Sequence, residues 1–264
     1  MVGISRDSPK YADRMQTRPL TLITGGSRGI GAATALRLAR AGHDLAISYV
    51  EDEQAASKVV VESRALGASC LAVRADVSSE IEVDRMFDML AAELGQLTGL
   101  VNNAGLTAHI ADLVDTPVEV IRRVIDVNLT GAVLCARRAV GAMAYDGGGR
   151  GGVIVNVSSG AATLGAPHEY VHYAAAKAGV DALTTGLAKE VAAAGIRVVG
   201  VAPGTIRTDI HAAAGDPGRP DRVADRVPLG RAGEADEIAD AIAWLISDEA
   251  SYVAGSTLRI TGGL

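Results

Sequence analysis

Short apolar runs alternate along the chain with longer segments whose apolar side chains recur at helical spacing. The runs consist largely of Val, Ile, Leu and Ala, as in strands buried on both faces of a parallel sheet. This alternation predicts an α/β fold with one doubly wound parallel sheet of about seven strands and helices on both faces. The expected strands are 20–24, 45–49, 70–74, 97–101, 153–157, 196–201 and 257–260, and the expected helices are 30–42, 53–66, 79–94, 116–143, 173–194 and 235–247.

Two of the expected helices have start signals of their own. Ser79 and Glu82 have the spacing of a capping box, in which each side chain bonds to the backbone N–H of the other residue. Thr116, Pro117 and Glu119 combine a capping hydroxyl, a proline at the first helical position and a capping carboxylate. The sequence therefore predicts that helices begin at these two points.

No stretch of the chain reads as a linker between two domains. The glycine-rich segment 146–152 is followed at once by a strand-like run, so it is expected to be a loop. Residues 203–231 are rich in Pro, Gly, Asp and Arg and have weak periodicity, which predicts a mobile lid. We expect a flexible extension over residues 1–18 and a single domain over residues 19–264.

Composition narrows the classes of function that fit the chain. Among 264 residues, 48% are hydrophobic but only 3% aromatic, and the net charge of −6 gives no basic surface for nucleic acid. Cys70 and Cys135 share no ligand-like spacing with the histidines, so no disulfide framework or metal site is expected. No apolar run reaches the roughly 20 residues that a membrane-spanning helix needs. A soluble protein of the reducing cytoplasm is expected.

A glycine-rich turn joins the first expected strand to the first expected helix. Its sequence, Thr24-Gly25-Gly26-Ser27-Arg28-Gly29-Ile30-Gly31, would let the backbone approach a pyrophosphate at the helix N-terminus. Turns of this kind also close ordinary strand-to-helix loops, and the spacing differs from the G-x-G-x-x-G fingerprint. Because a strand precedes the turn and a helix follows it, we interpret it as a dinucleotide-binding site.

The end of the second expected strand bears on the choice between the two nicotinamide cofactors. The residues at this strand end are Ser48 and Tyr49, and neither is acidic. A carboxylate at this place would accept a hydrogen bond from the ribose 2′-hydroxyl of NAD(H). With Arg28 in the glycine turn, this absence favours NADP(H), whose 2′-phosphate a guanidinium can bind. The acids at 51–53 follow closely and keep NAD(H) as the alternative.

Tyr173 and Lys177 lie four residues apart in an alanine-rich helical segment, which places both side chains on one face. An ammonium group near a phenol lowers the phenol pKa by roughly 1–3 units. This pair would then act as a proton shuttle at neutral pH. Such pairs also occur on solvated helix faces, so the context of the other motifs decides between the two interpretations.

Further polar motifs follow successive expected strands, namely Asp76-Val77, Asn102-Asn103-Ala104-Gly105, Ser158-Ser159 and Pro203-Gly204. Together with the glycine turn, Asn128 and the Tyr173/Lys177 pair, their order resembles the single-domain short-chain dehydrogenase/reductase family, from Leu20 to the end of the chain. The resemblance includes 3-oxoacyl-carrier-protein reductases and glucose dehydrogenases, and it implies a Rossmann-type fold.

The resemblance also implies roles for individual residues. Asn128, Ser159, Tyr173 and Lys177 correspond to the catalytic tetrad of the family, with Ser159 preferred over Ser158. Tyr173 would exchange a proton with the substrate oxygen, Ser159 would hydrogen-bond it, Lys177 would lower the Tyr173 pKa and hold the nicotinamide ribose, and Asn128 would anchor a water. The implied cofactor-binding residues are Thr24, Gly25, Ser27, Arg28, Gly29, Ile30, Gly31, Ser48, Tyr49, Asp76, Val77, Asn103, Ala104, Gly105, Tyr173, Lys177, Pro203, Gly204, Ile206 and Thr208.

We therefore expect an NADP(H)-dependent oxidoreductase that acts on a small carbonyl or alcohol, with a 3-oxoacyl or ketone reductase-like substrate. A sugar or polyol dehydrogenase is the alternative, and a catalytically inactive NADP(H)-binding sensor or scaffold is the alternative of another class. The resemblance implies a homotetramer, and Ala/Val-rich helices at 129–143 and 173–194 support a helix-to-helix subunit contact. Arg137 and Arg138 would dock an acidic acyl carrier or remain a solvated pair. Ile206, Ile210, His211, His168, Glu169 and His172 are expected around the substrate pocket.

Overall fold

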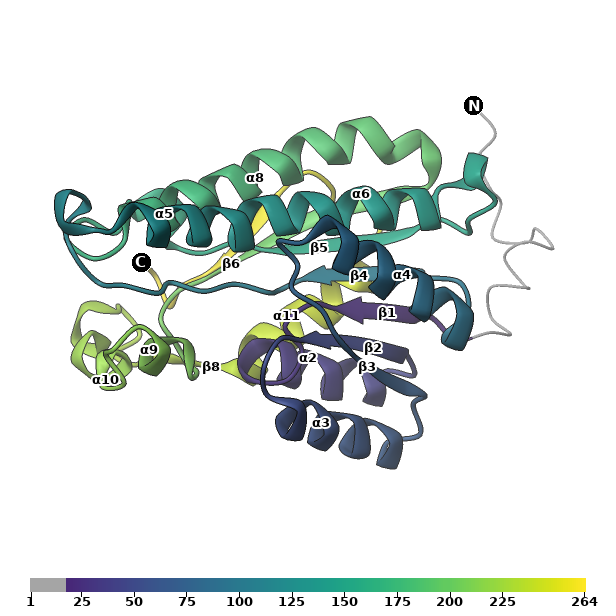
Figure 1. Ribbon diagram of the computed structural model, residues 1–264, viewed down its shortest axis with the longest axis horizontal. Helices are drawn as coiled ribbons and strands as arrows, with labels where there is room; N and C mark the ends of the chain where they lie inside the picture. The colour runs from purple at the N-terminus through teal and green to yellow at the C-terminus, as the bar shows by residue number, and fades with distance from the viewer. Residues whose placement is uncertain (1–17) are drawn as a thin grey trace.

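Seven parallel strands form the central sheet of the computed structural model, which describes residues 18–264 (Figure 1). The predicted extension over residues 1–18 lies, apart from Arg18, outside the described residues. The strand order is β3-β2-β1-β4-β5-β6-β9, so the predicted doubly wound α/β sheet is confirmed. The strands are β1 (Leu20–Ile23), β2 (Asp44–Tyr49), β3 (Cys70–Arg74), β4 (Gly99–Asn102), β5 (Gly152–Val157), β6 (Ile196–Pro203) and β9 (Thr257–Ile260).

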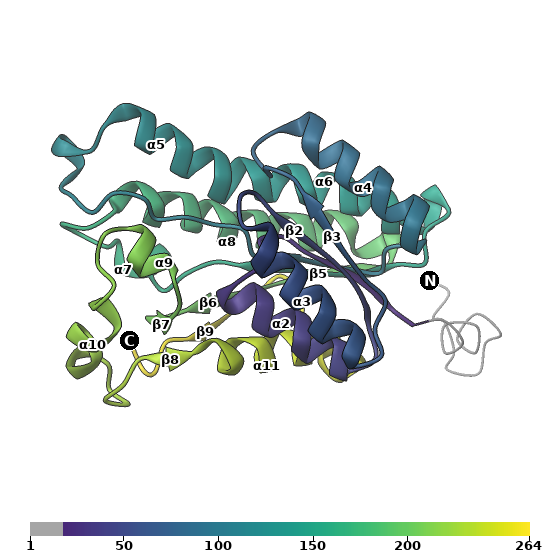
Figure 2. The same cartoon turned by 60° about the horizontal axis from the view of Figure 1, so that its bottom comes forward.

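Helices cover both faces of the sheet (Figures 1 and 2). One layer contains α2 (Gly29–Arg40), α3 (Glu53–Ala65) and α11 (Ala235–Ile246), and the other contains α4 (Glu80–Leu94), α5 (Val118–Ile125), α6 (Gly131–Met143) and α8 (Val171–Val191). Each layer has its own apolar core, with Leu38 and Ile242 in the first and Met86 and Cys135 in the second. Burial of these aliphatic side chains on both faces explains why the strands read as continuous apolar runs.

The strand order reverses between β1 and β4, which are parallel neighbours with Ile23 opposite Val101. The chain winds outward from β1 to β3 on one side and from β4 to β9 on the other. The loops that leave β1 and β4 therefore turn to opposite faces and open a crevice at the carboxyl ends of the strands. Ligands bind at such a switch point in open α/β sheets.

The predicted helix over residues 116–143 is interrupted in its middle. Residues Asp126–Thr130 form a π-helical turn between α5 and α6, and Asn128 lies within it. The Asn128 side-chain amide donates to the carbonyl oxygens of Val124 at 2.8 Å and Leu106 at 2.7 Å. A π turn frees backbone groups from the regular helical pattern, and such turns are frequent at functional sites.

Both predicted capping arrangements are only partly correct. Ser79 caps α4 by accepting a hydrogen bond from the Glu82 N–H, but the Glu82 carboxylate accepts from the Asp76 N–H instead of from Ser79. The Thr116 hydroxyl donates to the Asp112 carbonyl oxygen at 2.9 Å and caps no helix. In both cases a loop residue outside the local motif competes for the side chain, which the spacing alone cannot reveal.

The predicted lid, residues 203–231, consists of short elements and turns. They are β7 (Ile206–Arg207), α9 (Ile210–Ala213), α10 (Arg219–Arg222) and the 3₁₀ turn Ala224–Arg226, and β7 pairs with β8 (Gly233–Glu234). Arg207 forms ion pairs with Asp221 and Glu234, which tie the segment to the start of α11. The mobility of this lid stays a prediction. The remaining elements are α7 (Ala161–Leu164) and 3₁₀ turns at Leu113–Asp115, Tyr145–Gly147, Ala192–Ala194 and Asp248–Ala250.

Between residues 18 and 264, no helix combines the length and the apolar character that crossing a membrane demands.

Candidate active site

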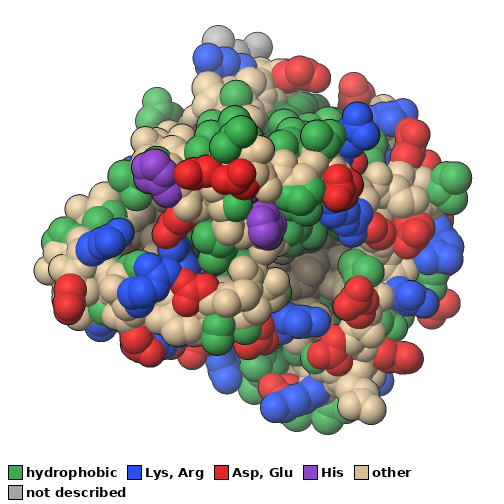
Figure 3. All heavy atoms as spheres, turned by 60° about the vertical axis from the view of Figure 1, so that its left-hand side comes forward, with side chains coloured by type: hydrophobic (Ala, Val, Ile, Leu, Met, Phe, Trp, Pro, Cys, Tyr) green, Lys and Arg blue, Asp and Glu red, His purple; other side chains and the backbone are tan. Residues whose placement is uncertain are grey.

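A cavity of ≈ 690 Å³ opens beyond the carboxyl ends of the strands. Its wall is formed by the glycine turn, by the residues that follow β2 to β6, by the start of α8 and by the lid. Figure 3 shows this hollowed face, with both Lys/Arg and Asp/Glu side chains exposed around it. The volume lies within the range of sites that bind small molecules or cofactors.

The glycine turn has the backbone geometry of an anion cradle. Gly29 has a φ of +53°, which side chains rarely tolerate, and a Cβ atom on Gly31 would lie 2.4 Å from the Gly25 carbonyl oxygen. The Arg28 side chain makes no capping bond, and the first turn of α2 contains no acid. The N–H groups at this helix N-terminus are therefore not neutralised by a carboxylate of the chain and fit the pyrophosphate of a dinucleotide.

Thr24 and Asn103 fasten the glycine turn to the end of β4. The Thr24 hydroxyl accepts hydrogen bonds from the N–H groups of Asn103 and Ala104, both at 3.0 Å. The Asn103 amide donates to the carbonyl oxygens of Thr24 and Gly25 at 2.9 and 3.0 Å. Thr24 is buried and lies behind the cavity wall. It therefore stabilises the glycine turn and does not face the cavity.

The predicted ribose end of the cavity contains both positive and negative side chains. Ser48 lines the cavity, but its hydroxyl accepts from the Gly25 N–H at 3.1 Å and so supports the turn. Arg28 is half-exposed, and its guanidinium lies 3.9 Å from the Asp52 carboxylate. Asp52 also caps α3 by accepting from the Ala55 N–H. The Arg28 guanidinium is thus placed to bind a phosphate, and the Asp52 carboxylate is placed to compete with that phosphate for Arg28.

Asp76 lies at the cavity wall after β3 and is held by two neighbours. Its carboxylate accepts from the Ser78 N–H at 3.0 Å and the Ser78 hydroxyl at 2.7 Å, and it pairs with Arg123 at 2.8 Å. Burial opposes ionisation, but these bonds outweigh it and lower the Asp76 pKa. A fixed, ionised carboxylate here is an acceptor for a donor group of a ligand.

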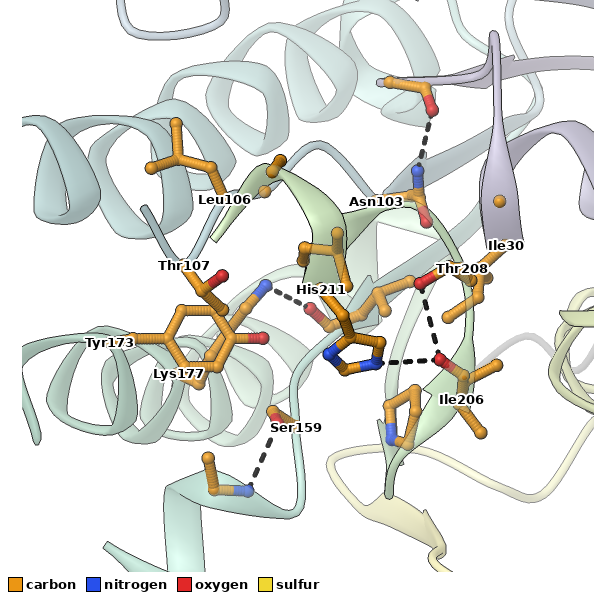
Figure 4. A pocket seen from close by; sticks show the side chains of 18 of the residues that line it. Ile30, Asn103, Leu106, Thr107, Ser159, Tyr173, Lys177, Ile206, Thr208 and His211 are labelled. Atoms are coloured by element: carbon orange, nitrogen blue, oxygen red, sulfur yellow. Dashed lines mark hydrogen bonds between the residues drawn. The ribbon is translucent and has the colours of Figure 1, made fainter. Parts of the chain in front are cut away.

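Tyr173, Ser159 and Lys177 meet on the other side of the cavity (Figure 4). Tyr173 and Lys177 come from α8, whereas Ser159 follows β5. Figure 4 shows the Tyr173 hydroxyl pointing into the cavity. The Ser159 hydroxyl accepts from the Ala161 N–H at 3.1 Å, and its interaction with the Tyr173 phenol lowers the Tyr173 pKa. Ser158 is buried, and its hydroxyl donates to the Lys177 carbonyl oxygen at 3.2 Å. The preference for Ser159 over Ser158 thus agrees with the geometry.

The predicted lowering of the Tyr173 pKa by Lys177 is wrong, because the Tyr173 pKa is raised. Burial raises the Tyr173 pKa to about 12, the bond from Ser159 lowers it in part, and the nearby Tyr170 phenol raises it. Lys177 lies 5.7 Å from the centre of the Tyr173 ring, and burial lowers the Lys177 pKa to about 8. Loss of hydration is the largest effect on both groups, because both lie deep in the wall.

Tyr170, Glu169 and Arg219 form a polar clamp between the start of α8 and the lid, a feature that the sequence did not predict. The Arg219 guanidinium hydrogen-bonds to the Glu169 carboxylate and stacks 5.4 Å from the centre of the Tyr170 ring. The Tyr170 ring in turn meets the Tyr173 ring edge to face, with centroids 5.4 Å apart. All four side chains line the cavity, so the clamp connects the lid with the candidate catalytic phenol.

The other residues expected around the substrate end divide into two groups. Glu169, Ile206, Ile210 and His211 line the cavity, as predicted. His168 and His172 do not, because His168 is exposed and contacts Asp112 at 2.8 Å, while His172 is buried away from the cavity. Arg137 and Arg138 are paired with acids on α4, namely Glu80, Asp84 and Asp88.

Most of the predicted site residues therefore come together at one cavity. Thr24, Gly31 and Asn128 lie behind its wall and support it. The wall itself contains Gly25, Ser27, Arg28, Gly29, Ile30, Ser48, Tyr49, Asp76, Val77, Asn103, Ala104, Gly105, Ser159, Tyr173, Lys177, Pro203, Gly204, Ile206 and Thr208.

The chain is similar to proteins of known families. A family model described as "Enoyl-(Acyl carrier protein) reductase" matches residues 25–264. An uncharacterized oxidoreductase of Escherichia coli (strain K12), YgfF, is 49% identical over 92% of this chain and 99% of its own. The 3-oxoacyl-[acyl-carrier-protein] reductase FabG of Staphylococcus aureus (strain Mu50) is 37% identical over 95% of this chain and 99% of its own.

Two solved structures are similar over nearly the whole chain. A short chain dehydrogenase from Burkholderia cenocepacia J2315 in complex with NADP has a TM-score of 0.86 and 34% identity, covering 93% of this chain and 97% of that one. A 3-ketoacyl-(acyl-carrier-protein) reductase from Brucella melitensis complexed with NADH has a TM-score of 0.85 and 32% identity, with the same coverage.

Proposed function

The chain belongs to the short-chain dehydrogenase/reductase family of nicotinamide-dependent enzymes, and we propose that it uses NADP(H) to interconvert a small carbonyl compound and its alcohol. The observation that carries the proposal is the single cavity that joins an anion cradle at the α2 N-terminus to the hydroxyls of Tyr173 and Ser159. Dinucleotide binding and proton transfer can then take place within one site.

The residues of the chain position the substrate and supply a proton. Nicotinamide bound in this cavity would supply the hydride, with its two electrons, to the carbonyl carbon in the reductive direction. Tyr173 donates its phenolic proton to the carbonyl oxygen, which becomes the alcohol, and Ser159 hydrogen-bonds that oxygen as negative charge develops. Lys177 lies close enough to stabilise the phenolate left on Tyr173, which regains its proton from solvent.

Lys177 in the cavity wall and Asn128 behind it support this chemistry. Lys177 donates to the Val157 carbonyl oxygen at 2.8 Å, and Asn128 fixes the loop at Leu106. We propose that both residues keep their family roles, with Lys177 reaching the nicotinamide ribose and Asn128 positioning a water for reprotonation. The cradle and the placement of Lys177 beside the cavity support these roles.

NADP(H) is proposed over NAD(H) because Arg28 lines the ribose end and no acid occupies Ser48 or Tyr49. Asp52, which faces Arg28, is the feature that opposes this choice. The similar structures were obtained with NADP in one case and NADH in the other, so they do not decide it. Turnover of one carbonyl substrate with NADPH and with NADH measures the preference directly.

For the substrate, we propose a ketone or 3-oxoacyl compound, which the printed names of the similar reductases support. A hydroxylated substrate, as in a sugar or polyol dehydrogenase, is the second candidate, because Glu169, Tyr170 and His211 give the cavity a polar wall. The ion pairs of Arg137 and Arg138 with α4 argue against an unpaired cationic site for an acidic carrier at that position.

The experiment is a kinetic screen of ketoesters, quinones and aldoses with NADPH and NADP⁺, followed by nicotinamide absorbance. Turnover in either direction supports the proposed function and orders the substrate classes. Tight NADPH binding without turnover of any compound would favour the alternative of an inactive sensor or scaffold. The retained Tyr173, Ser159 and Lys177 cluster argues against that alternative.

We also propose a homotetramer with helix-to-helix contacts. The exposed side of α8 presents Val171, Ala175, Ala178 and Ala182 at helical spacing, an apolar stripe that a second copy could cover. Light scattering after size exclusion tests this, and a monomer of 26.9 kDa would refute it. Ala178→Glu should dissociate the assembly if α8 forms the contact.

A further inference from the structure

His211 lies on the lid side of the cavity, in the short helix α9, and its imidazole has a defined tautomer. The ring nitrogen Nε2 lies 2.9 Å from the Ile206 carbonyl oxygen. A carbonyl oxygen only accepts hydrogen bonds, so Nε2 carries the hydrogen and donates it. In the neutral ring the other nitrogen, Nδ1, then has no hydrogen and is an acceptor.

The environment keeps this ring neutral at physiological pH. Burial is the main effect and lowers the His211 pKa, while the bond to the Ile206 carbonyl opposes it. The charged groups that face the ring are Arg219, which lowers the pKa further, and Asp216 and Glu169, which raise it. The net effect is a pKa below the ordinary value of a histidine, so Nδ1 keeps its lone pair near pH 7.

Figure 4 shows where that acceptor points. The ring of His211 faces the hydroxyl of Tyr173 across the cavity, and Nδ1 is the nitrogen on the Tyr173 side. Within residues 18–264, neither a side chain nor a main-chain group donates a hydrogen bond to Nδ1. His211 therefore presents an unused acceptor to the space in which the substrate carbonyl would lie.

We propose that His211 is a specificity-determining residue whose Nδ1 accepts a hydrogen bond from a hydroxyl group close to the substrate carbonyl. The substrate class is then a hydroxy ketone or hydroxy aldehyde, and a diol in the oxidative direction. This inference rests on the proposed function, because the carbonyl oxygen has to lie at Tyr173 and Ser159. The inference deepens that function, because it names the substrate group that the cavity wall opposite Tyr173 recognises.

The physical reason for selectivity is the cost of leaving a desolvated acceptor unpaired. A substrate with a hydroxyl donor forms a hydrogen bond to Nδ1. An analogue without the donor displaces water from Nδ1 and leaves it without a hydrogen bond. Sites built to bond a substrate hydroxyl reject analogues that lack it more strongly than apolar pockets reject a small change of size. We expect at least about tenfold discrimination in kcat/KM from this one bond.

The test compares acetoin, a hydroxybutanone, with its O-methyl ether, which has a similar shape but no hydroxyl hydrogen. Reduction of either adds a hydride from NADPH to the carbonyl carbon and a proton to the oxygen, giving the corresponding alcohol and NADP⁺. The full chain is assayed at neutral pH as the wild type, as His211→Asn and as His211→Phe. Asparagine offers an amide oxygen near the position of Nδ1, whereas phenylalanine keeps a ring without any acceptor.

The expected result is a preference of about tenfold or more for acetoin in the wild type, a ratio near one in His211→Phe and partial recovery in His211→Asn. Equal rates for the two ketones in the wild type would overturn the inference while leaving the proposed function intact. A preference that survives in a folded His211→Phe would also overturn it, because another group would then read the hydroxyl. The wild-type ratio stands even if a variant fails to fold.

A binding measurement covers the case in which neither ketone is turned over, so that the inference is tested separately from the proposed function. The ¹⁵N signals of the His211 imidazole, assigned by their loss in His211→Phe, report hydrogen bonding at Nδ1 directly. Addition of acetoin to the wild type should move the Nδ1 signal, and the methyl ether should not. If acetoin leaves that signal unchanged, the inference fails.

Discussion

Lys177 donates a hydrogen bond of 2.8 Å from its Nζ to the main-chain carbonyl oxygen of Val157, two residues before Ser159. The bond anchors the ammonium group to the end of β5 and sets it beside the Tyr173 ring, 5.7 Å from the ring centre. Two elements of the site are thereby fixed to each other, α8 with its phenol and the strand end with its hydroxyl. The bond also places a cation where burial opposes its charge, since the Lys177 pKa falls to about 8.

The burial of Lys177 predicts a specific dependence of stability on pH. A pKa of about 8 in the folded chain, against 10.5 for an ordinary lysine, means that the unfolded state binds more protons between these values. The free energy of unfolding should therefore rise with pH from about 8 towards 10.5, by at most about 3.5 kcal/mol, since one pKa unit corresponds to ~1.4 kcal/mol. Denaturant titrations of the wild type and Lys177→Met between pH 7 and pH 9.5 measure it.

The comparison with Lys177→Met isolates this contribution from that of other groups. The Tyr173 pKa of about 12 acts with opposite sign, but only above about pH 10, where the unfolded phenol begins to lose its proton. The wild type should gain stability relative to Lys177→Met as pH rises through the tested range. A difference between the two that is independent of pH would show that Lys177 is not buried as a cation.

Arg28 is predicted to decide the preference between cofactors. Arg28→Ala should weaken NADPH binding about tenfold, because a charge-assisted bond to the 2′-phosphate is lost, and should change NADH binding little. Fluorescence titration of each nucleotide gives the two dissociation constants. Arg37→Ala is the matched control, since Arg37 lies on α2, the helix that Arg28 precedes, and pairs with Asp240 at 2.7 Å away from the cavity. An equal loss for both nucleotides in Arg28→Ala would contradict the proposed NADP(H) preference.

Arg219 is predicted to hold the lid against the start of α8, beside the substrate end of the cavity. Arg219→Met removes both the bond to Glu169 and the stacking on Tyr170, so the KM of the carbonyl substrate should rise about tenfold. NADPH binding should change less than twofold, because the glycine turn is untouched. The control is Arg222→Met, which breaks a more exposed pair with Asp216 on the same lid. If both variants raise KM equally, the clamp has no special role.

The fold and the general place of the site follow from short-range patterns. Apolar runs, the glycine turn and the four-residue spacing of Tyr173 and Lys177 are all local features, and the structure preserves them. What could not be predicted depends on neighbours distant in the sequence. Glu169 and Arg219 lie 50 residues apart in the sequence, and no local pattern in either segment predicts their contact.

The charge state of the site shows the same limit. Spacing placed Lys177 beside Tyr173 and suggested that the cation lowers the phenol pKa, whereas burial by the surrounding elements has the larger effect. The depth at which a side chain lies is a property of the packed molecule. For the same reason Thr24, which the motif marks as a cofactor contact, turns out to hold Asn103 and Ala104 behind the wall.

The central claim is that the phenol of Tyr173 transfers the proton in a nicotinamide-dependent reaction. The most direct measurement is the rate of carbonyl-dependent NADPH oxidation by Tyr173→Phe, with Tyr170→Phe as the matched loss of a neighbouring phenol and with NADPH binding measured for both. The account predicts that Tyr173→Phe loses about 10²–10⁴-fold in kcat/KM while binding NADPH within about twofold of the wild type. Tyr170→Phe should stay within about tenfold of the wild type, since its ring packing is kept. Turnover by Tyr173→Phe close to that of the wild type would contradict the account.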